Sequence, residues 1–265
     1  MKIVVPVKQV AALDEEFELL DGGLAVDPDF VEWDLNEWDT FSLEAALQIR
    51  ESAGGDGHEV VVLTVGDEEA EEGLRSCLAK GADRALRVWD ESLRGADVLA
   101  VARVLAVAVE RESPDLVLCG VQSSDAVNGA TGVALAGYLD LPHVAVVKRI
   151  EYDPVASSAT VQRELEGGLV EVLRVRTPAL LTVQTGINEP RYATLRAIKQ
   201  AREKPLEVSG LAELGLGGEV LEAATGSKHV RLATPDRGAG AEMLGGPPAT
   251  VAARIVEIVK ERMSG

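Results

Sequence analysis

The sequence predicts an α/β protein of three layers, with a doubly wound, mostly parallel sheet between two layers of helices. Short runs of Val, Ile and Leu recur without polar alternation through the first half of the chain, as in strands buried on both faces. Segments with helical periodicity separate these runs, which is the pattern of successive βαβ units. Hydrophobic residues make up 46% of the 265 residues, which is enough to build such a core.

The expected elements alternate regularly as far as residue 142. We expect buried strands at 2–7, 59–65, 84–89 and 115–120, and helices at 39–51, 67–81, 97–112 and 129–141. The helix at 67–81 has the clearest end signals, because acidic residues open it and Lys80-Gly81 closes it. Right-handed crossovers through these helices would join the strands into one sheet.

The pattern changes after residue 142. The strands expected at 144–152, 160–165, 170–176 and 179–185 alternate more strongly, and Glu166-Gly167-Gly168 is typical of a hairpin turn, so we expect an antiparallel extension of the sheet. A loop and a helix near 192–203 follow, then a Gly-rich stretch at 205–246 and an amphipathic helix at 247–263 that begins with Pro. We expect a main domain at 1–204, including the loop and helix of 184–204, and a C-terminal arm and helix at 205–265.

Charge and cysteine usage exclude several classes of protein. The net charge of −18 argues against nucleic acids and anionic membrane surfaces as partners. Cys77 and Cys119 stand in apolar segments without a CxxC spacing, so we expect neither a disulfide framework nor a zinc site. With no signal peptide and no apolar run long enough to span a membrane, we expect a cytoplasmic protein.

The carboxyl ends of the parallel strands are the expected binding edge, because ligands of such sheets sit there near a topological switch point. The ends concerned are Val5-Pro6-Val7-Lys8, Val65-Gly66-Asp67 and the loop from Gly120 to Gly132. That loop is rich in Ser, Asp, Asn and Gly, has no Lys or Arg, and leads into a helix whose first N–H groups could hold a phosphate. A polar connection with ordinary capping is the alternative.

Other nucleotide and hydrolase motifs are absent from the sequence. It contains no GxGxxG after a strand, no GxxxxGK[ST] and no GxSxG. Ser123-Ser124 is therefore interpreted as a cap or a ligand contact rather than a nucleophile. The turn Asn36-Glu37-Trp38-Asp39 precedes a helix, where it either caps that helix around a packed Trp or covers the same binding edge.

Five patches in a specific order give the chain a family resemblance. They are the opening VPVKQV, Asn36 ahead of the helix at 39–51, AKGADRAL at 79–86, RELEGGL at 163–169, and the segment Asn188-Glu189-Pro190-Arg191-Tyr192-Ala193-Thr194-Leu195. With them the chain resembles the β subunits of electron transfer flavoproteins over essentially its whole length. The resemblance implies an electron carrier without a catalytic site of its own, which pairs with an α subunit holding most of the FAD.

The resemblance also implies a structural AMP in the domain at 1–204. The positions that match the AMP contacts of the family lie at the strand ends, the capping turn and the polar loop: Pro6, Asn36, Glu37, Trp38, Asp39, Val65, Gly120, Gln122, Ser123, Ser124, Asp125, Asn128, Gly129, Ala130 and Thr131. Two alternatives stay open. One is a bifurcating form with a second FAD at this site, and the other is an ATP-hydrolysing or nucleotide-sensing protein on the same fold.

A recognition loop is the last implied feature. In the family this loop docks on acyl-CoA dehydrogenases and other flavin dehydrogenases, and electrons then pass toward a quinone oxidoreductase. The matching positions are Asn188, Glu189, Pro190, Arg191, Tyr192 and Leu195, with Leu195 as the apolar anchor. From the residues alone, the alternative is that Leu195 packs beneath its own helix. Glu164 matches a glutamate that meets an arginine of the mobile flavin domain.

Overall fold

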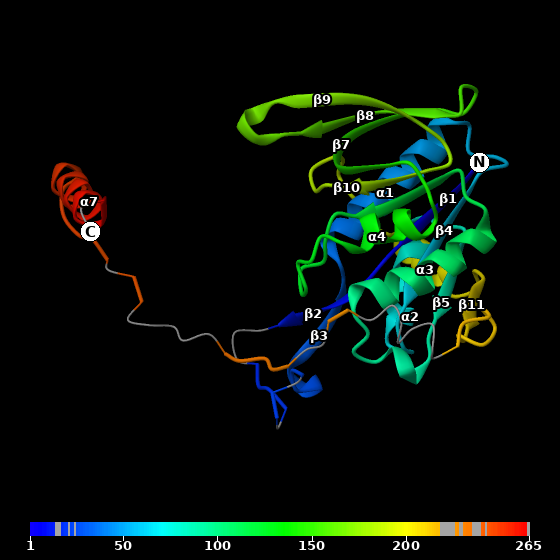
Figure 1. Cartoon of the computed structure of the whole chain (residues 1–265), viewed down its shortest axis with the longest axis horizontal. Helices are drawn as coiled ribbons and strands as arrows, with labels where there is room; N and C mark the ends of the chain where they lie inside the picture. Colours follow the sequence, from blue (N-terminus) through cyan, green and yellow to red (C-terminus); the bar gives the residue numbers. More distant parts are fainter. Residues whose placement is uncertain are drawn as a thin grey trace.

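A single large sheet organises the chain in the computed structural model, which describes residues 1–13, 17–20, 22–23, 25–217, 226–227, 230–234, 240–241 and 243–263. Within that part of the chain the sheet has nine strands, in the order β11-β5-β4-β1-β6-β10-β7-β8-β9 (Figure 1). Their bounds are β1 Lys2–Pro6, β4 Glu59–Val65, β5 Arg84–Val88, β6 Leu116–Gly120, β7 His143–Asp153, β8 Ser158–Glu164, β9 Val170–Arg176, β10 Ala179–Val183 and β11 Leu206–Ser209.

The sheet reverses its winding direction beside β1. From β1 the chain moves outward through β4 and β5, and then returns to place β6 on the other side of β1. All four strands run parallel, as their continuous apolar runs predict. The gap between the carboxyl ends of β1 and β6 is therefore the topological switch point, where ligands of this architecture bind.

Helices cover both faces of the sheet and complete the predicted three layers (Figure 1). Alternate residues of one strand point to opposite faces, so Ile3 and Val5 join one core and Val4 the other. Helices α1 (Glu37–Ser52) and α2 (Ala70–Lys80) pack against the first core, with Leu43, Leu47, Leu74 and Leu78. Helices α3 (Val98–Glu112) and α4 (Thr131–Tyr138) pack against the second.

Two features of the sheet differ from the expectation. β10 was expected in the antiparallel extension, but it pairs in parallel with β6 and with β7. The antiparallel pairs described in the main sheet are β7 with β8 and β8 with β9. All five of its side chains are buried, the property of a central parallel strand. β11 was not predicted, and it extends the sheet in parallel beside β5. Its four residues carry too little pattern to stand out from the Gly-rich stretch.

A small antiparallel ribbon, also not predicted, forms outside the main sheet. It joins β2 (Gln9–Leu13) to β3 (Val31–Leu35) and leads directly into α1. The described part of the chain also contains three short 3-10 turns, at Pro28–Phe30, Glu91–Leu93 and Glu166–Gly168. The ribbon brings the carboxyl end of β1 close to the start of α1, because Asn36 donates its N–H to Lys8 O at 2.9 Å.

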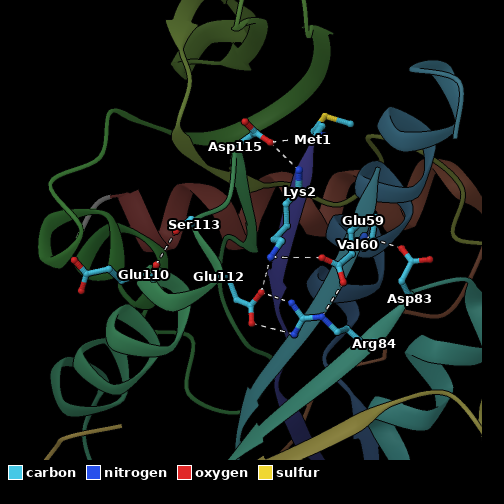
Figure 2. Close-up of polar contacts among 10 residues, drawn as sticks. All are labelled: Met1, Lys2, Glu59, Val60, Asp83, Arg84, Glu110, Glu112, Ser113 and Asp115. Atoms are coloured by element: carbon cyan, nitrogen blue, oxygen red, sulfur yellow. Dashed lines mark hydrogen bonds and ion pairs between the residues drawn. The ribbon is translucent and has the colours of Figure 1, made fainter. Parts of the chain in front are cut away.

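An ion-pair network closes the opposite, amino-terminal edge of the sheet (Figure 2). Lys2 Nζ lies 3.0 Å from Glu112 Oε2 and 3.5 Å from Glu59 Oε2. Arg84 donates through Nε to Glu59 at 2.7 Å and through Nη1 to Glu112 at 3.0 Å. Burial raises the pKa of Glu112, but the hydrogen bonds from Arg84 and Lys2 outweigh it and lower the pKa. The network thus joins the first residues of β1, β4 and β5 to the end of α3.

The C-terminal helix α7 (Pro248–Met263) lies apart from the sheet (Figure 1). None of its residues is buried, and Ile255, Val256, Val259 and Met263 expose apolar side chains. Nearer the core, Leu211, Leu214 and Leu216 are buried against the α3 face. Among the described residues, no helix combines the length and apolar character that a bilayer span requires.

Candidate functional site

The predicted strand ends converge at the switch point between β1 and β6. Lys8, just beyond β1, donates its backbone N–H to Asp39 Oδ2 at 2.8 Å. A Cβ placed on Gly120, the last residue of β6, would lie 2.8 Å from the Cβ of Trp38, so α1 packs directly on the end of that strand. Because real Cβ atoms do not approach so closely, Gly120 is required here for packing space. The capping turn therefore covers the binding edge.

Asp39 is the buried centre of this arrangement. Only 4% of the residue is exposed, and the Asn36 side chain and the backbones of Lys8 and Gly120 approach its carboxylate. Burial raises the pKa of Asp39 to about 7, although these hydrogen bonds act to lower it. One side chain thus joins the start of α1 to the ends of β1 and β6.

Asn36 holds the polar loop after β6 rather than capping its own helix. Its Nδ2 donates to Gln122 O at 2.8 Å, and its Oδ1 accepts from Ser124 N at 3.2 Å. The side chain makes no capping bond to α1. Of the two interpretations of this turn, the geometry therefore favours contact with the loop over a helix cap alone.

Lys8 adds a cation to a loop that has none of its own. Its Nζ lies 2.6 Å from Asp125 Oδ2 and 3.3 Å from Ser123 Oγ. Burial raises the pKa of Asp125, and the hydrogen bond from Lys8 reverses this and lowers it. Sequence reasoning named Lys8 only as a strand end and gave it no role. The sequence did indicate that Lys8 follows a strand that ends at the same edge of the sheet as the polar loop.

The first N–H groups of helix α4, which follows the loop, donate no hydrogen bond to a capping side chain. Ala130 precedes α4 and supplies no side-chain hydrogen bond to the first turn. The loop before it has a strained backbone, because Val127 has a φ of +51°, a conformation that a β-branched residue rarely adopts. Gly129 has a φ of +59°, which suits glycine. N–H groups at a helix start that lack a side-chain cap suit an anion.

The remaining predicted binding residues frame the same edge. Pro6 is buried at the end of β1, and Val65, partly buried, ends β4 two strands away from β6. Trp38 is fixed by a hydrogen bond from Nε1 to Gln184 Oε1 at 2.9 Å, and sequence reasoning gave Gln184 no role. The exposed side chains of the predicted set are Glu37, Ser124, Asp125 and Asn128; Gln122, Ser123, Ala130 and Thr131 are partly buried.

The predicted docking loop divides into inward and outward residues. Tyr192 is 95% exposed and Leu195 is 81% exposed, at the start of helix α5 (Leu195–Ala201). Leu195 therefore does not pack beneath its own helix, which was the alternative interpretation. Glu189 is also exposed and Pro190 partly buried. Asn188 instead turns inward, where Nδ2 donates to Phe41 O at 3.0 Å and Oδ1 is buried with no hydrogen-bond partner among the described residues.

Arg191 also turns inward, onto α1. It donates to Glu44 through Nε at 2.8 Å and to Glu51 through Nη1 at 2.6 Å. Hydrogen bonds with both carboxylates raise the pKa of Arg191, and the pKa of each glutamate is lowered. Neither glutamate was singled out from the sequence, because nothing local connects α1 with a loop 140 residues later.

Glu164 lies at the end of β8 and has a partner within the chain. Its Oε2 is 2.7 Å from Lys148 Nζ on β7, and both side chains are largely exposed. The hydrogen bond from Lys148 lowers the pKa of Glu164. The carboxylate is accessible to a second cation from outside.

Metal and thiol chemistry have no candidate in the part of the chain that the structure describes. Its His, Cys, Asp and Glu residues form no group of three or more that could hold a metal ion. Burial raises the pKa of the Cys77 thiol to about 12 and raises that of Cys119 further. Such thiols stay protonated and unreactive at neutral pH.

Comparison with known proteins gives one consistent result. The profile of the electron transfer flavoprotein domain matches residues 24–214. The β subunit of the electron transfer flavoprotein from Methylophilus methylotrophus is 49% identical over 262 residues, which cover 98% of each chain. The Bacillus subtilis β subunit is 31% identical over 261 residues, again 98% of each chain. Subunit CarD of the caffeyl-CoA reductase–Etf complex from Acetobacterium woodii is 35% identical over 231 residues, 86% of each chain.

Proposed function

The chain belongs to the β subunits of electron transfer flavoproteins, and from this membership we propose that it holds AMP at the switch point and docks on flavin dehydrogenases. Proteins with this name act as subunits of electron carriers rather than as catalysts. Beyond its place in an electron carrier, we propose for this chain a structural nucleotide, a docking loop and specific partner enzymes.

The observation that carries the nucleotide proposal is the joint fixation of three segments around Asp39 and Asn36. These two side chains hold Lys8, Gly120, Gln122 and Ser124 in one arrangement, ahead of the uncapped start of α4. The N–H groups of Thr131 and its neighbours would receive the phosphate, because a helix start favours an anion. Lys8 would exchange part of its contact with Asp125 for the phosphate.

The adenosine would lie along the strand ends. Pro6 and Val65 at the strand ends would make apolar contacts with the adenosine. Glu37 in the turn before α1, and Gln122 and Asp125 in the loop after β6, would meet polar groups of the base and ribose. Trp38 flanks this edge with its indole held by Gln184. The remaining proposed contacts are Ser123, Ser124, Asn128, Gly129 and Ala130, all in the loop that Asn36 secures.

A second FAD in place of AMP is the competing assignment. It is favoured by the similarity to a subunit of a complex named for caffeyl-CoA reductase and Etf. Extraction of the nucleotides from the purified heterodimer distinguishes the two. We expect one FAD and one AMP per heterodimer by chromatography and absorbance. Two FAD molecules and no AMP would support the second assignment, and an adenine-free β subunit would contradict both. Steady release of ADP from ATP and Mg²⁺ would instead indicate an ATP-hydrolysing protein.

The proposed docking surface is the exposed part of the recognition loop, Glu189, Tyr192 and Leu195. Its partners would be acyl-CoA dehydrogenases and other flavin dehydrogenases, and the electrons would pass on to an electron transfer flavoprotein–quinone oxidoreductase. Burying one leucine on docking contributes about 1.5–3 kcal/mol, which favours an encounter without making it permanent. We place Glu164 at the contact with the mobile flavin domain of the α subunit, where it would have to share its charge with Lys148.

A further inference from the structure

Helix α1 makes hydrogen bonds with three residues in and just before the docking loop, Gln184, Asn188 and Arg191. Trp38 Nε1 reaches Gln184 where the loop begins, and Phe41 O accepts from Asn188 Nδ2. Glu44 and Glu51 then hold Arg191. These α1 residues lie three, three and seven apart, so they share one side of the helix over four turns. The loop is laid along this side.

The strongest of these contacts is between Arg191 and Glu44. Arg191 donates to Glu44 through Nε at 2.8 Å, through Nη2 at 2.9 Å and through its backbone N–H at 3.2 Å. Gln48 Nε2 adds a fourth donor, 2.9 Å from Glu44 Oε1. Glu44 is only 5% exposed. A planar guanidinium that binds a carboxylate at two points fixes direction as well as distance, so this pair determines how the loop lies.

The ends of the loop region have other anchors. After the loop, Thr194 Oγ1 accepts from Ala197 N and caps α5, and Arg75 Nη1 donates to Ala201 O and Lys204 O at 2.8 and 2.7 Å. Before it, β10 pairs on both sides. Between Asn188 and Thr194, the contact with Glu44 and Glu51 is the chief polar attachment in the described contacts.

We propose that Glu44 is a positioning residue for docking: through Arg191 it holds the loop so that Tyr192 and Leu195 stay presented to the partner enzyme. The inference rests on the proposed docking function. It gives Arg191 an inward role, in place of the partner contact expected from the sequence. Glu51 binds the same guanidinium but contributes less to holding the loop. Its side chain is 49% exposed, against 6% for Glu44, so solvent screens its charge more.

The matching experiment uses the flavin-loaded heterodimer as the varied substrate of an acyl-CoA dehydrogenase. Glu44→Gln preserves the shape of the side chain but removes its charge and one of its two acceptor oxygens, each of which accepts two hydrogen bonds. We expect the KM for the heterodimer to rise about tenfold with kcat unchanged, because a loop that is no longer held in place must be ordered on docking. Amide exchange in the peptide covering 188–194 should also quicken about tenfold, since the acceptor of Arg191 N–H weakens from a carboxylate to an amide oxygen.

Three further variants make the result specific. Glu91→Gln makes the same charge change at the exposed Glu91–Arg94 pair and should leave KM and exchange as they are. Arg191→Lys keeps the charge but not the two-point contact, so it should raise KM by a smaller factor than Glu44→Gln. Leu195→Ala tests the docking function itself.

The outcomes separate the two levels of proposal. A raised KM for Leu195→Ala with a normal KM for Glu44→Gln would overturn the role of Glu44 and leave docking intact. A normal KM for Leu195→Ala would remove the docking function and this inference with it. A lower melting temperature for Glu44→Gln without a change in KM or in local exchange means a purely structural role and overturns the inference. If Glu44→Gln does not assemble, Arg191→Lys decides by the same two measurements.

Discussion

At the scale of single residues, two acidic side chains show how burial decides the strength of an ion pair. Glu112 contacts both Lys2 and Arg84 and its side chain is 12% exposed, whereas Glu91 pairs with Arg94 and its side chain is 74% exposed. Solvent screens the exposed pair, whereas removal of the buried acid leaves Lys2 and Arg84 to share the more exposed Glu59.

We expect Glu112→Gln to lower the free energy of unfolding by about 1–2 kcal/mol, because the acid is largely buried while Glu59 still contacts both cations. Glu91→Gln should change it by less than about 0.5 kcal/mol. Urea unfolding of the two variants, followed by circular dichroism, measures both values. Equal effects from the two substitutions would show that the network in Figure 2 does not stabilise the sheet edge.

Leu195 is the single residue from which we expect an effect on function rather than on stability. Its side chain lies in solvent, so its truncation removes no internal packing. We expect Leu195→Ala to reduce kcat/KM for electron transfer from a dehydrogenase by about tenfold or more, from the 1.5–3 kcal/mol that a buried leucine contributes. FAD content, by absorbance, should be unchanged. Loss of FAD, or unaltered transfer kinetics, would contradict the assignment.

At the scale of elements, Asp39 couples the start of α1 to the ends of β1 and β6. Its pKa is about 7 in the folded chain because of burial, and an ordinary aspartate in the unfolded chain titrates near 3.8. Between these two values the folded state holds the proton more tightly. Asp39 therefore lowers stability progressively as the pH rises from about 4 to about 7, and by a constant amount above that.

Replacement by asparagine should remove this pH dependence. We expect the difference in unfolding free energy between the wild type and Asp39→Asn to change by on the order of 4 kcal/mol from pH 4 to pH 8, in favour of the variant at the higher pH. Comparing the two proteins at each pH cancels the other titrating groups. Parallel pH profiles would mean that Asp39 is ionised throughout.

The position of a residue relative to its helix or strand also explains whether its role could be predicted from the sequence. The loop from Gly120 to Thr131 was predicted as a binding segment because it follows a parallel strand at its carboxyl end, where ligands of such sheets bind. Glu44 and Gln184 could not be predicted, since each sits in a segment whose composition is ordinary. Their importance comes from partners 147 and 146 residues away in the chain.

At the scale of the whole molecule, α7 is separate from the folded core. It has an amphipathic pattern but no buried residue in this chain alone. A helix with an unpaired apolar face is stabilised by a partner, and we propose that the C-terminal arm and helix of 205–265 lie partly against the α subunit.

Deletion of residues 248–265 tests this arrangement. The melting temperature of the shortened chain alone should stay within about 2 °C of the full chain, because no core contact is lost. Affinity for the α subunit should fall at least about tenfold, from the loss of one or more buried aliphatic side chains. Calorimetric titration measures the affinity. An unchanged affinity would place the helix elsewhere.

The sequence alone determined the architecture and the family of this protein. Apolar runs and helical periods act over a few residues, so the parallel core, the covering helices and the polar loop could be predicted from local pattern. The tertiary structure decided what depends on contacts between distant segments. It placed β10 within the parallel part of the sheet, added β11 to its edge, brought Lys8 to Asp125, and turned Arg191 onto Glu44. The physical reason is that strand neighbours and buried ion pairs are chosen by packing in three dimensions, which no local stretch of sequence contains.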